Sequence, residues 1–93
     1  MYQSRASVST PNAERLIKRL SNHWRHKFPV QISPEGADIE LPIGTCSLHN
    51  TQGGLQVTLK ASEDEQLQRM QTVVADHLQR MGNDEALAFD WQP

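Results

Sequence analysis

Two hydrophobic periods alternate along the chain and predict its elements. Hydrophobic residues recur at every second position in the ranges 2–9, 30–32, 38–41, 45–49, 55–60 and 87–91, which is the period of a strand with one buried face. In the ranges 11–27 and 62–81 they recur at every third or fourth position, as in an amphipathic helix. The predicted order of elements is therefore β-α-β-β-β-β-α-β.

Local signals predict where the two helices begin and end. Thr10 and Pro11 provide a hydroxyl N-cap and a proline at the first helical position. Pro29 disfavours helical backbone at the residue before it, so the first helix should end near Lys27. The second helix should begin with a capping box from Ser62 and end at Gly82.

Each predicted helix has one apolar stripe and each predicted strand one apolar face. The arrangement that buries all of them is an α+β fold, with two helices on one face of a single antiparallel sheet. A chain of 93 residues is expected to form one domain over residues 1–93. The expected core is Leu16, Ile17, Leu20, Trp24, Leu48, Val57, Leu59, Val74, Leu78 and Phe89. The expected polar face of the sheet carries Gln31, Asp38, Glu40, Ser47, His49, Thr58 and Asp90.

The composition argues against a disulfide-stabilised, membrane-spanning or secreted protein. Cys46 is the single cysteine, so no disulfide can form within the chain, and the alternation places it on the dry face of the sheet. No apolar run approaches the roughly 20 residues needed to span a bilayer, and the first residues do not resemble a signal peptide. We therefore expect a cytoplasmic protein that does not associate with membranes.

Charge is distributed unevenly along the chain. The first predicted helix holds five basic residues and one acidic residue, for a net charge of +4, whereas the other four basic and ten acidic residues give −6. The five basic residues are Arg15, Lys18, Arg19, Arg25 and Lys27. This helix should present a positive face, which is either merely solvated or used to bind an anion. Nucleic acid is disfavoured as a partner, because the pI is near 6.0 and no aromatic platform accompanies the basic residues.

The histidines do not form a recognisable metal motif. His23 and His26 are neighbours on a helix, but a metal site needs three or four ligands. Cys46 and His49 lie on opposite faces of a strand and cannot complete the set. We expect no metal site, and the sequence does not indicate which cofactor, if any, the protein binds. His77 falls within the apolar stripe of the second helix, so we expect it to be largely buried and neutral.

Two classes of function remain open. The segment His23, Trp24, Arg25, His26 and Lys27 could bind an anionic ligand or partner, although histidines at a helix end also simply offset the helix dipole. Alternatively, the protein could be an enzyme that uses His23, His77 or the carboxylates of the sheet face as acid–base groups. No candidate pair is held together by sequence spacing. We therefore favour a binding module, with no catalytic residue assigned.

The chain resembles the small bacterial family called domain of unknown function 2218 over nearly its whole length. The resemblance rests on the Thr10-Pro11 helix start, the segment His23 to Lys27, the stretch Pro42 to Leu48 and the closing Asp90 to Gln92. It implies no established activity. Members occur fused to siderophore-interacting proteins or encoded beside them, which implies a role in iron acquisition. A ferric siderophore, or a siderophore-interacting protein, is the partner that this resemblance implies.

Overall fold

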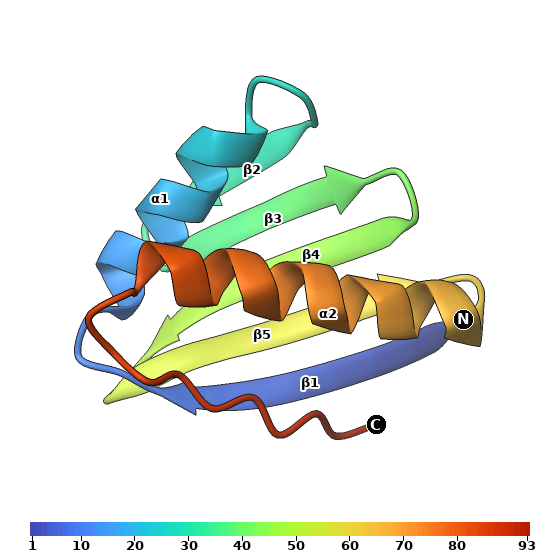
Figure 1. The fold of residues 1–93 in the computed structure, drawn as a ribbon. Helices are drawn as coiled ribbons and strands as arrows, with labels where there is room; N and C mark the ends of the chain where they lie inside the picture. The colour runs from blue at the N-terminus through green and yellow to red at the C-terminus, as the bar shows by residue number, and fades with distance from the viewer.

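The computed structural model describes residues 1–93 and contains five strands and two helices (Figure 1). The strands precede or separate the helices in the order β-α-β-β-β-β-α. Their bounds are β1 (Tyr2–Ser9), α1 (Ala13–Trp24), β2 (Val30–Ser33), β3 (Gly36–Leu41), β4 (Gly44–Thr51), β5 (Gly54–Ala61) and α2 (Asp64–Met81). Neither helix combines the length and hydrophobicity needed to cross a membrane.

All five strands form one antiparallel sheet in the order β1-β5-β4-β3-β2. Both helices lie in front of this sheet in Figure 1 and contact each other. Helix α1 packs on β2, β3 and β4, and helix α2 packs on β1, β4 and β5. The predicted α+β fold with two helices on one sheet face is confirmed.

The core lies between the helices and the sheet. Nine of the ten residues expected in the core are buried, and Phe89 packs against them while partly exposed. Leu16 and Leu20 from α1 meet Val74 and Leu78 from α2 in the same cluster. Burying an aliphatic side chain of this size contributes about 1.5–3 kcal/mol, so this layer is the main source of stability.

The predicted final strand over residues 87–91 does not form as a strand. After α2 the chain runs extended beside β1 and pairs with it at one position only, where Arg5 and Gln92 exchange two backbone hydrogen bonds of 2.7 Å. Phe89 and Trp91 stack on each other with ring centroids 5.8 Å apart and pack against the core. The apolar alternation therefore reports side-chain packing here, without a hydrogen-bonded ladder.

Both helices begin later than the local signals predict. Helix α1 begins at Ala13, three residues after Thr10, and the hydroxyl of Thr10 accepts a hydrogen bond from the backbone amide of Asn12 (3.0 Å), which precedes the helix. Helix α2 begins at Asp64, after an extended Glu63 that makes no side-chain cap. The predicted capping box is therefore absent, and α1 also ends at Trp24, three residues before Lys27.

Candidate functional site

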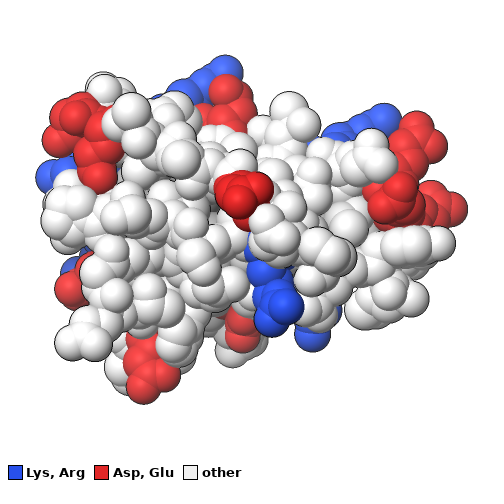
Figure 2. Space-filling view, turned by 90° about the horizontal axis from the view of Figure 1, so that it is seen from below, with Lys and Arg blue, Asp and Glu red and all other residues white.

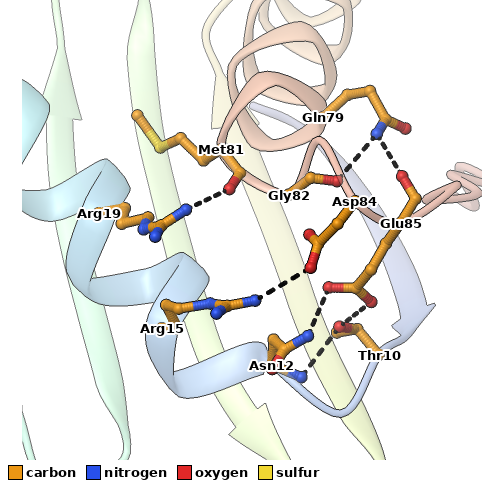
Figure 3. A network of polar contacts seen from close by, with 9 residues as sticks. All are labelled: Thr10, Asn12, Arg15, Arg19, Gln79, Met81, Gly82, Asp84 and Glu85. Carbon is orange, nitrogen blue, oxygen red and sulfur yellow. Dashed lines mark hydrogen bonds and ion pairs between the residues drawn. The ribbon is translucent and has the colours of Figure 1, made fainter.

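A polar clasp joins the turn after α2 to the start of α1 (Figure 3). The Glu85 carboxylate accepts hydrogen bonds from the Thr10 hydroxyl (2.6 Å) and the Asn12 side-chain amide (2.8 Å). Arg15 forms an ion pair with Asp84 at 3.7 Å. Nearby, the Arg19 guanidinium donates to the Met81 carbonyl at 2.7 Å. Arg15 and Arg19, two of the five basic residues of the first helix, thus have partners at this junction.

Gln79 holds the turn itself in place. Its side-chain amide donates to the carbonyls of Gly82 (3.3 Å) and Glu85 (2.7 Å) and accepts from the Leu87 amide (3.0 Å). In Figure 3 these bonds bring the Glu85 backbone toward α2 while its carboxylate reaches the start of α1. The clasp therefore orders the turn and links the two helices through polar contacts.

We expect Glu85→Ala to lower the free energy of unfolding by about 1–3 kcal/mol, because it leaves the partly buried Thr10 and Asn12 donors without their acceptor. The matched control is Asp84→Ala, which removes only an exposed ion pair and should cost less than about 1 kcal/mol. Urea unfolding of both variants measures the difference. Equal costs would mean that the clasp does not act through Glu85.

The candidate binding residues lie at the C-terminal end of α1 and in the turn that follows it. His23, Arg25, His26 and Lys27 are exposed, and we call these four side chains the cationic end of α1. Neither Arg25 nor Lys27 has an acidic group within 4.0 Å, and the Arg25 guanidinium makes one long hydrogen bond, to the Asn22 side chain at 3.5 Å. In contrast, Lys18 pairs with Glu14. The unpaired positive charge of the helix is concentrated at this end.

Trp24, the fifth candidate, faces the core. Only 4% of its surface is exposed, and its ring packs edge-on against Phe28 at 6.3 Å. A ligand at the cationic end would contact the residues around Trp24 and not the indole itself. Trp24 instead fixes the end of α1 on the sheet, which sets the directions of its exposed neighbours.

The structure brings His23 and His77 together from different helices. Their ring centroids are 5.3 Å apart, and the His77 ring lies 5.0 Å from the Trp24 ring. His77 Nδ1 is 2.7 Å from the Val73 carbonyl, so this nitrogen is the protonated donor. His77 is only partly buried, less than its place in the apolar stripe predicts. It lies at the open edge between the helices, beside exposed His23.

This histidine pair has neither a metal-ligand set nor a cleft around it. No group of three or more histidine, cysteine, aspartate or glutamate side chains is placed to hold a metal ion. Neither His23 nor His77 lines any of the main surface pockets. No enclosed space beside the pair would hold a substrate.

The helix-free face of the sheet carries polar side chains in cross-strand rows. Asp38 lies opposite Ser47, which in turn lies opposite Thr58. Glu40 lies opposite Thr45, and His49 lies opposite Gly36. Because no histidine faces either carboxylate across the strands, this face does not assemble an acid–base pair.

Sequence reasoning missed a cleft of about 230 Å³ between α1 and the turn from β2 to β3. It lies on the side of α1 away from α2. Ile17 and Ser21 line it from the helix, and Ile32 and Glu35 line it from the hairpin. The Ser21 hydroxyl is buried without a hydrogen-bond partner. Nothing in the helical period alone distinguishes this serine from an ordinary buried one.

Figure 2 views the side on which β1 and the extended C-terminal segment lie in Figure 1. Charged side chains of both signs are scattered there, and no large patch of one sign forms. This side therefore offers no electrostatic site that could compete with the cationic end of α1.

Fold and surface together define a two-layer α+β domain with an unpaired cationic helix end. The chain belongs to the family DUF2218, described as an uncharacterised protein conserved in bacteria, whose model matches residues 5–92. It is also similar to PA4090 from Pseudomonas aeruginosa, which has been solved by NMR. The two sequences are 41% identical, the match covers 100% of this chain and 97% of that chain, and the TM-score is 0.84. No curated protein matches the chain.

Proposed function

We propose that this protein is a binding module that contacts an anionic ligand or an acidic partner through the cationic end of α1. The observation that carries the proposal is the pairing pattern of the helix charges. Arg15, Lys18 and Arg19 are held by groups of the protein itself, whereas Arg25 and Lys27 are exposed and have no acidic neighbour. Unpaired, exposed charges are the ones that can attract an anion.

We further propose that the ligand is a ferric siderophore, or that the partner is a siderophore-interacting protein. Ferric siderophores are often anionic, and the gathering of Arg25, Lys27 and two exposed histidines suits a ligand with several acidic oxygens. The link to iron acquisition is the one that the family resemblance implies.

We expect the double variant Arg25→Glu and Lys27→Glu to bind an anionic ferric siderophore at least tenfold more weakly than the wild type, with an unchanged melting temperature. The matched control is Arg69→Glu with Lys60→Glu, which changes the net charge equally at exposed positions elsewhere. Calorimetric titration in about 0.1 M and about 1 M salt adds a second readout, because the Debye length falls from about 10 Å to about 3 Å. Equal affinity of the two double variants would remove the cationic end as the contact surface.

A second candidate is an enzyme that uses His23 and His77 as acid–base groups. It is supported by their ring separation of 5.3 Å. The lack of a pocket beside the two rings weighs against it, because acid–base catalysis needs a substrate held within hydrogen-bond reach. A His77→Asn variant separates the candidates: it should leave siderophore affinity intact if the protein is a binding module.

A further inference from the structure

The two edge strands of the sheet differ in whether their outer backbone groups have hydrogen-bond partners. At the outer edge of β1, Arg5 exchanges two backbone hydrogen bonds with Gln92 of the C-terminal segment. The outer edge of β2 has no such partner, because β2 pairs only with β3. An unpaired edge strand presents a row of free N–H and C=O groups to any strand that can approach it.

The hydrogen bonds of β2 show which residues face outward. The Pro29 carbonyl accepts from the Glu40 amide at 3.0 Å, so position 29 faces β3. Along an antiparallel strand the backbone N–H and C=O groups of successive residues point alternately to the two sides. Those of Gln31 and Ser33 therefore also point toward β3. The N–H and C=O groups of Val30 and Ile32 therefore point away from the sheet.

The side chains of β2 do not protect this edge. The strand has no charged residue, and Ile32 is 63% exposed, which is unusual for a large apolar side chain within a strand of this protein. Natural edge strands are commonly shielded by lysine, an inward charge or a bulge. Here Lys27 lies before the strand and Glu35 lies after it, and both are exposed.

We propose that β2 pairs antiparallel with β2 of a second copy of this chain, so that the two sheets join into one. Gln31 then faces Gln31 of the second copy at the two-fold axis. Val30 lies opposite Ile32 of the second copy, and Ile32 lies opposite Val30 of the second copy. These positions are the outward-facing ones, so each pair can exchange two backbone hydrogen bonds. The same pairing covers the exposed Ile32 with a β-branched neighbour.

Charge favours this orientation of the second copy. Lys27 lies in the turn before β2 and Glu35 in the turn after it, so antiparallel pairing places Lys27 of one copy at the same end of the joined strands as Glu35 of the other. Lys27 and Glu35 therefore meet at both ends of the paired strands, whereas a parallel arrangement would place like charges together. The pairing involves only a short strand and its flanking turns, so we expect a weak dimer that forms at high concentration.

Sedimentation velocity tests the pairing directly. The wild type should shift from monomer toward dimer as its concentration rises to roughly 1 mM. The Ile32→Pro variant should dimerise with an affinity at least tenfold weaker. Proline removes only the outward-facing Ile32 N–H, so the intrachain ladder and the circular dichroism spectrum should remain unchanged. Ile32→Val is the matched control and should associate like the wild type. A wild type that stays monomeric throughout, or an Ile32→Pro variant that associates equally well, would overturn the proposal.

A charge exchange tests the antiparallel orientation of the second copy. Lys27→Glu and Glu35→Lys should each weaken the dimer several-fold, and the double variant should restore it. If all three variants dimerise with the affinity of the wild type, the copies associate through another surface, or β2 pairs with a different strand. The result is separable from the proposed anion site, because Ile32→Pro should weaken self-association while leaving anion affinity unchanged.

Discussion

Leu20→Ala is expected to lower the free energy of unfolding by about 2–5 kcal/mol. Leu20 has no exposed surface and lies in the middle of the cluster that joins α1, α2 and the sheet. Truncation removes apolar contacts with both layers and leaves a cavity that surrounding side chains can fill only in part. The whole stability of a domain of this size is about 5–15 kcal/mol, so the loss is a large fraction of it.

Urea unfolding monitored by circular dichroism measures this cost. The control is Ile32→Ala, which removes an aliphatic side chain that is 63% exposed and should change stability by less than about 0.5 kcal/mol. The slope of the unfolding free energy against urea should stay the same in both variants. A Leu20→Ala cost as small as that of the control would mean that α1 does not contribute to the core.

Periodicity was sufficient to predict the two layers of the fold because each residue contributes to them through its own burial. Leu16, Leu20 and Trp24 fall on one side of a helical wheel, and the structure buries all three. Cys46 and Leu48 alternate with polar neighbours, and both face the helices. The order β2-β3-β4-β5 then follows from short antiparallel connections between sequential strands, whereas the place of β1 beside β5 does not.

The last segment shows the limit of that reasoning. Leu87, Phe89 and Trp91 alternate as in a strand, yet only Gln92 pairs with β1. Alternation reports which side of an extended chain is covered, and it does not report whether backbone groups of a neighbouring strand lie within reach. The missing capping box has a similar origin, because the Ser62 hydroxyl contacts the Gln66 side chain instead of a helix N–H.

The candidate site was predictable residue by residue but not as a constellation. The exposed cationic residues follow from charge and from the position of the apolar stripe. The contact of His23 with His77 and the hydrogen bond of Thr10 to Glu85 depend on the offset of α1 relative to α2 along the helix axes. That offset is set by the packing of the whole core, and no local spacing encodes it.

The stability of the protein is expected to fall at alkaline pH through Cys46. Burial, together with the nearby negative charge of Asp38, raises the pKa of the Cys46 thiol from 9.0 to about 12. Between these values the folded protein keeps the proton while the unfolded chain releases it. The unfolded state therefore binds fewer protons, and the unfolding free energy falls as pH rises, by about 1.4 kcal/mol for each pH unit above 9.

Comparison of the wild type with Cys46→Ala isolates this effect, because the two proteins differ at this residue alone. Cys46→Ala should be less stable at pH 7, where the lost thiol leaves a small cavity in the core. At pH 10 the stability advantage of the wild type should be smaller by about 1.4 kcal/mol. Below pH 8 the Cys46 thiol of the folded protein is buried and protonated, and only a thiolate reacts with a disulfide reagent. The thiol should therefore react only after unfolding. A difference between the two proteins that stays constant from pH 7 to pH 10 would contradict a buried, protonated Cys46.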